Sequence, residues 1–112
     1  NSADDARIQK VQADFKSIET ALKIYRLDNY VYPTTEQGLE ALVTPSSLEP
    51  EPRNFKQGGY LSELPMDPWG RSYLYLSPGE YREVDIYSMG ADGLPGGEGQ
   101  NTDIGNWNQT SG

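Results

Sequence analysis

The sequence lacks both cysteine and histidine, and these two absences exclude several classes of function. Without cysteine there is no disulfide, no thiolate nucleophile and no cysteine-based zinc site. Without histidine the chain lacks the commonest general base and the commonest ligand of transition metals. Any bound metal must therefore be held by oxygen atoms, which favours Ca²⁺ or Mg²⁺.

Basic residues and long apolar runs are also scarce. Nine Lys and Arg face 17 Asp and Glu, giving a net charge of −8, which argues against nucleic acid binding. No apolar run is long enough to cross a bilayer, and no signal peptide is recognisable. Leu, Ile, Val and Phe make up only about a fifth of the residues, although eight Tyr and two Trp add large apolar surfaces. We expect one domain over residues 1–112, with a thin core that needs additional stabilisation.

Residues 2–29 show the clearest periodic pattern in the chain. Apolar residues at intervals of three and four place one stripe on an α-helix, formed by Ile8, Val11, Phe15, Ile18, Leu22 and Tyr25. Ser2 is the predicted N-cap, and Asn29 is the predicted C-terminal cap because Asn tolerates the left-handed conformation. A helix of roughly six or seven turns is long for this chain. It is either a core helix or a stalk that extends beyond the domain, and the stripe alone does not separate the two.

The middle of the chain predicts a second, short helix and then a loop. Thr34 and Gln37 have the spacing of a capping box, which predicts a helix over residues 35–43 that Pro45 terminates. Residues 44–59 are rich in Pro and Gly and of mixed charge. We therefore expect them to form an irregular surface loop.

Two alternating runs further along predict a β-hairpin. They cover residues 73–76 and 84–89, with a Pro-Gly turn between them, and Asp85 is expected on a solvent-exposed face. From Gly90 onward we expect a loop. Two tryptophans are expected to pack against apolar residues, with Trp69 filling the core and Trp107 fixing the end of the chain to the domain. The predicted fold is α+β, with the long helix packed on a small antiparallel sheet.

The last part of the chain is acidic and rich in glycine, and no basic residue follows Arg82. Asp92 and Asp103 have the spacing of the first and last positions of an EF-hand loop, but Leu94 and Gly96 stand where that motif needs Asp or Asn. The stretch is therefore not an EF-hand. A Gly-rich loop can still direct carbonyl and carboxylate oxygens at Ca²⁺. The alternative is a solvated acidic tail without a ligand.

Enzymatic functions find little support in the sequence. The Gly97-Glu98-Gly99 stretch does not follow a strand-to-helix pattern, which argues against a dinucleotide site. Carboxylate pairs such as Glu36 with Glu40 lack a predicted deep cleft, which argues against a glycosidase. We therefore expect no catalytic residues and no organic cofactor.

Seven short blocks follow one another along the chain. They are residues 25–29 (Tyr-Arg-Leu-Asp-Asn), residues 32–43 (Tyr-Pro-Thr-Thr-Glu-Gln-Gly-Leu-Glu-Ala-Leu-Val), residues 59–61 (Gly-Tyr-Leu), residues 64–70 (Leu-Pro-Met-Asp-Pro-Trp-Gly), residues 76–79 (Leu-Ser-Pro-Gly), residues 90–93 (Gly-Ala-Asp-Gly) and residues 103–107 (Asp-Ile-Gly-Asn-Trp). Each block is weak by itself, but the combination, in this order, closely resembles the major pseudopilins of the bacterial type II secretion system.

The resemblance implies a pilin-like fold and a mechanical role. The family's subunits begin with a hydrophobic helix that anchors in the inner membrane, about the length that a bilayer requires. We expect the 112 residues to be the periplasmic part of such a protein, with residues 2–29 continuing that helix as a stalk. The implied function is polymerisation into a pseudopilus that drives folded proteins across the outer membrane. The implied partners are further copies of itself, minor pseudopilins and the inner-membrane assembly platform.

The resemblance also implies a structural calcium ion in the C-terminal loop. The implied ligands are the side chains of Asp92 and Asp103 and the backbone carbonyls of Met89, Leu94 and Gln100. Thr102 stands where some relatives carry an acidic residue, and Glu98 is a reserve carboxylate, so the roles of these two stay open.

Other interpretations remain open at this point. The chain could be a minor pilin or adhesin-like subunit of a type IV pilus system, or a calcium-dependent binding module. The resemblance further suggests a hypothesis that Lys23 of one subunit pairs with Glu63 of another, since both carry charges opposite to those expected in relatives. An exposed pair of this kind contributes less than about 1 kcal/mol.

Overall fold

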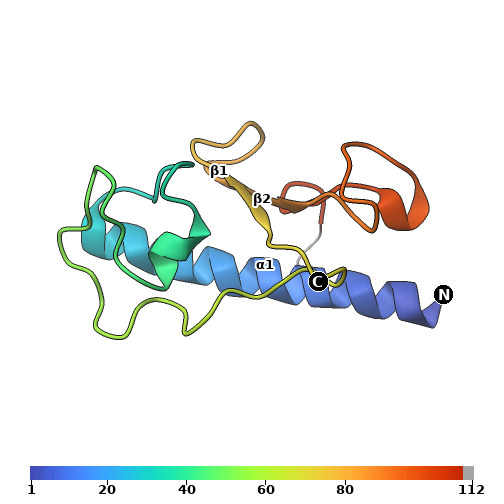
Figure 1. Ribbon diagram of the computed structural model, residues 1–112, viewed down its shortest axis with the longest axis horizontal. Helices are drawn as coiled ribbons and strands as arrows, with labels where there is room; N and C mark the ends of the chain where they lie inside the picture. The colour runs from blue at the N-terminus through green and yellow to red at the C-terminus, as the bar shows by residue number, and fades with distance from the viewer. Residues whose placement is uncertain (110–112) are drawn as a thin grey trace.

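One long helix runs along the whole molecule, and every other element lies on one side of it (Figure 1). The structure is a computed structural model that describes residues 1–109. Its elements in chain order are helix α1 (Ser2–Asn29), the 3₁₀ helix η1 (Leu39–Leu42), strands β1 (Leu74–Leu76) and β2 (Asp85–Ser88), the 3₁₀ helix η2 (Gly99–Asn101) and strand β3 (Ile104–Gly105). The strands form one antiparallel sheet in the order β1-β2-β3. The predicted α+β architecture is confirmed.

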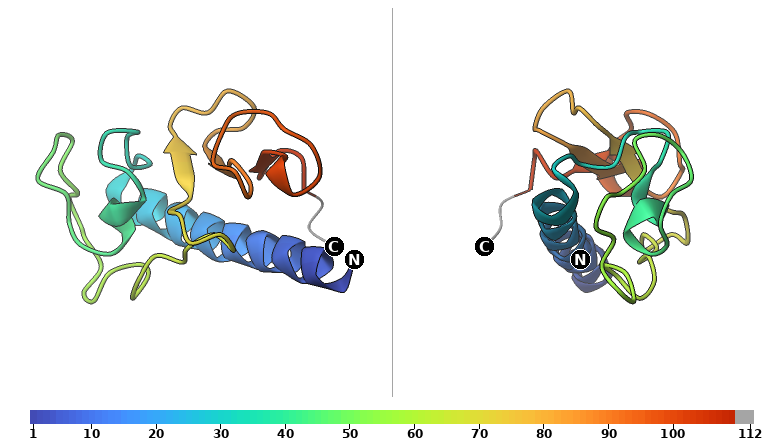
Figure 2. Two further views of the ribbon diagram at one scale, coloured as in Figure 1. Left: turned by 45° about the vertical axis from the view of Figure 1, so that its right-hand side comes forward. Right: turned by 90° about the vertical axis from the view of Figure 1, so that its left-hand side faces the viewer.

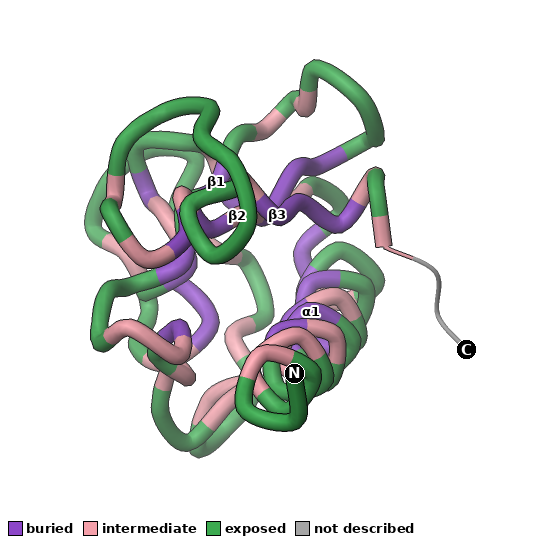
Figure 3. The backbone as a smooth tube through the Cα atoms, turned by 90° about the vertical axis from the view of Figure 1, so that its right-hand side faces the viewer, coloured by how far each residue is buried: buried purple, intermediate pink, exposed green. Residues whose placement is uncertain are grey.

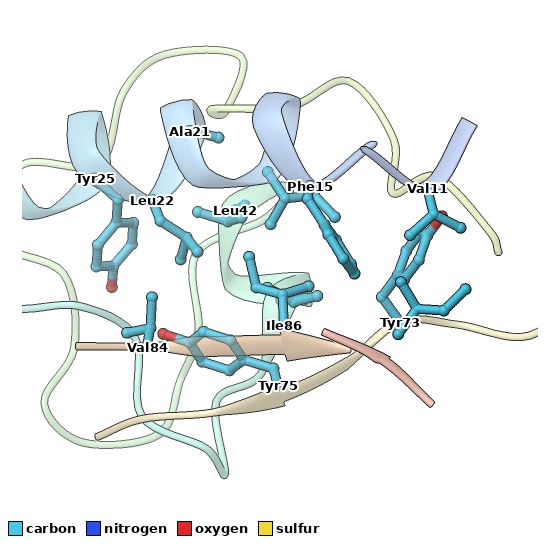
Figure 4. Packing of buried hydrophobic residues seen from close by; sticks show 13 residues of the cluster. Val11, Phe15, Ala21, Leu22, Tyr25, Leu42, Tyr73, Tyr75, Val84 and Ile86 are labelled. Carbon is cyan, nitrogen blue, oxygen red and sulfur yellow. The ribbon is translucent and has the colours of Figure 1, made fainter. Parts of the chain in front are cut away.

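The apolar stripe of α1 faces the sheet, as the periodicity predicts. Five of the six stripe residues are buried, and Ile8 near the start is half-buried. Figure 3, viewed along the helix, shows buried positions on the side toward the sheet and exposed positions on the other. The opposing side of the core comes from the inner face of the sheet, mainly Tyr73, Tyr75 and Ile86 (Figure 4). Phe15 meets Tyr73 edge to face, with ring centroids 5.5 Å apart.

Both predicted caps of α1 are wrong by one position. The N-cap is Asn1, whose side chain accepts a hydrogen bond from the backbone N–H of Asp4 at 3.0 Å. At the other end Tyr30 adopts the left-handed conformation, with φ of 72°. Asn29 instead stays helical and buried, because its side chain is used within the core. Its amide donates to the Tyr25 carbonyl at 3.0 Å and to the Tyr60 hydroxyl at 3.1 Å.

The predicted second helix shrinks to the four residues of η1. Thr34 and Gln37 do exchange the two reciprocal hydrogen bonds of a capping box, at 2.9 and 3.0 Å. The box closes a turn and no α-helix follows, because Gly38 takes a positive φ of 69°. The Gln37 amide also donates to the carbonyls of Leu48 and Pro50 at 2.8 and 2.9 Å. This side chain therefore ties the irregular loop to the turn.

The hairpin is confirmed, but the expected exposure of Asp85 is wrong. Its carboxylate is buried because the connecting loop wraps over it. Backbone N–H groups of Glu80, Tyr81 and Arg82 donate to it at 2.7, 3.1 and 2.9 Å. The sheet also gains β3, a two-residue strand within the segment predicted as loop, which pairs Ile104 with Ser88.

Candidate metal-binding loop

The acidic stretch forms a closed loop that leaves the sheet at β2 and returns to it at β3. The N–H of Ala91 donates to the Gln100 carbonyl at 2.8 Å, which joins the two sides of the loop. Gly90 stands where these sides meet, with φ of 75°. A Cβ atom there would lie 2.8 Å from the carbonyl oxygens of both Gln100 and Thr102. Only glycine fits this position without moving the backbone.

A buried network holds the base of this loop against the sheet. Asp67 accepts from the Arg71 N–H at 2.8 Å through one oxygen and from the Ser88 hydroxyl at 2.8 Å through the other. The Ser88 hydroxyl oxygen in turn accepts from the N–H of Gly90 at 3.2 Å. The Arg71 guanidinium donates to the carbonyls of Gly90 and Ala91, both at 2.8 Å. Two segments about 20 positions apart in the sequence, residues 67–71 and 88–91, therefore fix where the loop begins.

Sequence reasoning missed these supporting residues. The sequence predicts only that Trp69 fills the core, and Trp69 does pack against the core. One feature of the sequence does point to part of this network. Asp67 is followed by Pro68 and Gly70, and an Asp in such a turn often accepts hydrogen bonds from backbone N–H groups two to four residues later. Nothing in the sequence indicates that the same carboxylate reaches Ser88.

Asp103 is the residue that fits a cation best. Its Oδ2 accepts from the Gly96 N–H at 3.0 Å. Its Oδ1 is buried and has no hydrogen-bond partner in the part of the chain that the structure describes. A buried carboxylate oxygen without a donor is costly, and a bound cation would remove that cost. The residues of this loop therefore fit an oxygen-coordinated metal.

The other predicted ligands lie around the same loop with different exposure. Asp92 is exposed and accepts from the Leu94 N–H at 3.1 Å, which forms a local turn. Gln100 lies in η2, where its carbonyl faces Ala91. Met89 directly follows β2 and is half-buried, whereas the Leu94 side chain is 61% exposed.

The loop does not contain a preformed cluster of carboxylates. Within residues 1–109, no three acidic side chains gather closely enough to hold a metal ion. Glu98 and Thr102 are both exposed. A cation here would depend on two carboxylates and on backbone carbonyls, which is a donor set that suits Ca²⁺.

Comparison with known proteins identifies the family. The sequence profile described as "Type II secretion system (T2SS), protein G" matches residues 1–107. The chain belongs to this family. It is similar to "Type II secretion system core protein G" of Vibrio cholerae, with 58% identity over 100 residues that cover 89% of this chain and 68% of the relative. The protein of the same name from Pseudomonas aeruginosa is 50% identical over 104 residues, covering 93% and 73%.

A solved structure supports the same family. The crystal structure of the major pseudopilin from the type 2 secretion system of enterohaemorrhagic Escherichia coli matches with a TM-score of 0.87 and 52% identity. The match covers 96% of this chain and 92% of that chain. The resemblance seen in the sequence blocks is therefore confirmed, and the fold is that of a pseudopilin of this secretion system.

Two further observations concern the helices and two charged side chains of this chain. None of the helices in residues 1–109 combines the length and the apolar character that a membrane span requires. Lys23 and Glu63 are both exposed, and neither takes part in a salt bridge within the described residues. The contact between subunits hypothesised above stays a prediction.

Proposed function

We propose that this chain is the subunit that polymerises into the periplasmic pseudopilus of a type II secretion system and thereby drives folded proteins across the outer membrane. The observation that carries the proposal is the match of nearly the whole chain, at 52% identity, to a major pseudopilin. The family is one of structural secretion components, so the role is mechanical. Minor pseudopilins and the inner-membrane platform are the proposed partners.

The proposed mechanism follows from head-to-tail association. When one surface of a subunit contacts a different surface of the next, and the rotation between them does not close, the product is a filament. The helix α1 has one face buried against the sheet and the other uncovered (Figure 3). The uncovered face is available for neighbouring subunits, and growth of the filament would push the secreted protein outward.

Calcium is proposed to stabilise the C-terminal loop of each subunit. The side chains of Asp92 and Asp103 would hold the ion, together with the carbonyls of Met89, Leu94 and Gln100. The unpartnered Oδ1 of Asp103 supports this assignment. A ligand that binds only the folded state stabilises it by roughly 2.7 kcal/mol at a hundredfold excess over its dissociation constant. For a small domain with a total stability of about 5–15 kcal/mol, this is a large share.

Complementation in the bacterium that encodes the chain tests the secretion role. Deletion of the gene is expected to leave the exported proteins in the periplasm, and the full-length gene supplied in trans should restore their release. Unchanged secretion after deletion would contradict the proposal. An alternative role as a minor pilin predicts a different result, in which overproduction of the full-length protein yields no fibres that contain it.

A further inference from the structure

A tight turn brings one arginine, Arg71, against the acidic loop (residues 89–103). This loop lies over the N-terminal half of α1, whereas the irregular loop lies over the C-terminal half (Figure 1 and the left view of Figure 2). The N–H of Arg71 donates to the Asp67 carboxylate at 2.8 Å, and its carbonyl accepts from the Asp67 N–H at 2.7 Å. Trp69, inside the same turn, packs against the core. The backbone of Arg71 is therefore fixed relative to the rest of the domain.

The Arg71 side chain contacts the loop backbone on both sides of Asp92. Before Asp92, its Nη2 donates to the carbonyls of Gly90 and Ala91, both at 2.8 Å. After Asp92, Gly93 packs directly on the guanidinium, because a Cβ atom on Gly93 would lie 2.7 to 2.8 Å from three atoms of that group. These three neighbours enclose Asp92, so Arg71 fixes the backbone from which this aspartate projects.

The carbonyls that Arg71 engages differ from those proposed to bind calcium, which belong to residues 89, 94 and 100. The N–H of Ala91 also donates to the Gln100 carbonyl at 2.8 Å. Arg71 and this bond together hold the two sides of the loop in one arrangement. A binding site that is ordered beforehand loses less conformational freedom when its ligand binds.

The charge of Arg71 acts against a bound cation. Residues 91–103 contain three acidic residues and no basic one. Arg71 brings a positive charge to this loop and takes part in no salt bridge within the residues that the structure describes. Like charges repel, so the charge alone would weaken the binding of calcium. Any favourable effect of Arg71 on calcium must come from the backbone that it holds.

We propose that Arg71 is a positioning residue of the calcium loop, which holds the backbone around Asp92 before the ion binds and thereby raises the affinity in spite of its charge. The inference rests on the proposed role of calcium and adds to it a residue that binds no metal itself. Residues that orient metal ligands through hydrogen bonds commonly determine much of the affinity of a site. The guanidinium suits this task because its donors have a fixed planar geometry.

Calcium titration of the purified 112-residue chain tests the proposal, with isothermal calorimetry on Arg71→Gln and Arg71→Lys. Arg71→Gln should raise the dissociation constant by roughly tenfold to a hundredfold. Arg71→Lys keeps the charge but loses the planar donor geometry, so it should also bind more weakly, by a smaller factor. If the charge were the main effect, Arg71→Gln would instead bind calcium more tightly. The two explanations thus predict opposite signs.

The matched control is Arg82→Gln, which removes another exposed arginine that donates to one carbonyl, that of Asn106, at 3.3 Å. Arg82 lies outside the acidic loop, so this variant should keep the dissociation constant of the unmodified chain. Thermal midpoints in chelator are measured for every variant. An arginine that only supports the fold would lower the midpoint and leave the affinity of the folded protein unchanged.

Hydrogen exchange in chelator gives a second readout that needs no metal. The Ala91 amide should lose protection in Arg71→Gln and keep it in Arg82→Gln. An unchanged or tighter dissociation constant in Arg71→Gln overturns the proposal. If that variant does not fold, Arg71→Lys decides, and unchanged affinity there overturns it. If the unmodified chain takes up no calcium, the proposed role of calcium fails first, so the two failures are distinguishable.

Discussion

Buried polar side chains hold the loops of this small domain in place. Asp85 receives three backbone N–H groups from the hairpin loop. Asp67 connects its own turn to Ser88. Asn29 accepts from the Asn54 N–H at 2.8 Å while its amide donates to α1 and to Tyr60. Each of these side chains accepts hydrogen bonds from backbone N–H groups of a loop, which have no partner in a helix or strand.

Removal of the Asp85 carboxylate is predicted to destabilise the fold strongly. Asp85→Ala leaves three N–H groups without their charged acceptor, so the free energy of unfolding should fall by about 3 kcal/mol. Urea denaturation of purified protein measures it. The control is Glu83→Ala, an acid nearby whose side chain is 72% exposed and forms a salt bridge with Arg26, for which a loss below about 1 kcal/mol is expected. Equal losses in the two variants would show that Asp85 acts only as a surface charge.

These residues show what a sequence pattern does not predict. Alternation along residues 84–89 correctly predicts a strand, but it also places Asp85 in solvent. The pattern contains no information about the hairpin loop, which covers this side chain. Similarly, Asn29 fits the preferences of a C-cap. The requirement for a buried amide beside Tyr60 overrides that preference, and the left-handed conformation passes to Tyr30.

At the scale of the elements, α1 and the sheet are joined by an aromatic and polar contact near the start of the core. The Tyr73 hydroxyl donates to Asp14 at 2.6 Å, and Lys10 lies 2.6 Å from the same carboxylate oxygen. Burial raises the pKa of Tyr73 well above its usual value, and the hydrogen bond to Asp14 raises it further. The phenol therefore stays protonated in the folded state at pH values where an unfolded tyrosine ionises.

This raised pKa predicts a loss of stability in alkali. Above about pH 10 the unfolded state releases the Tyr73 proton while the folded state keeps it, so stability falls as pH rises. Tyr73→Phe removes this contribution and should make the fall less steep between about pH 9 and pH 11. Free energies of unfolding measured across that range check the slope. Tyr81→Phe, at a position that is 59% exposed, should leave it unchanged; identical slopes for Tyr73→Phe and unmodified protein would refute the assignment.

Element length explains which elements the sequence predicts. The helix Ser2–Asn29 spans several repeats of its apolar period, and the hairpin strands lie in two alternating runs. By contrast, η1 has four residues and β3 has two, which is too short for any period to be recognised. β3 exists because Ile104 pairs with Ser88 and buries its side chain, and this depends on tertiary contacts.

At the scale of the whole molecule, a thin core lies between one helix and three short strands, and much of the remaining chain is loop. The acidic loop is the largest segment beyond β2, and its base is fixed by Arg71 and Ser88. The assignment of Asp92 and Asp103 to a metal comes from the resemblance, and it stays a prediction. The sequence did not predict this base, because the contacts join residues that lie about 20 positions apart.

A cation in the acidic loop is proposed to complete the fold of the subunit. The most direct measurement is thermal unfolding of the chain in calcium and in chelator, for unmodified protein, Asp92→Ala, Asp103→Ala and a Glu63→Ala control. Calcium at a hundredfold excess over its dissociation constant should raise the midpoint by about 10 °C or more. Both aspartate variants should lose this shift, and Glu63→Ala should retain it. The same midpoint in calcium and chelator for the unmodified protein would contradict the claim.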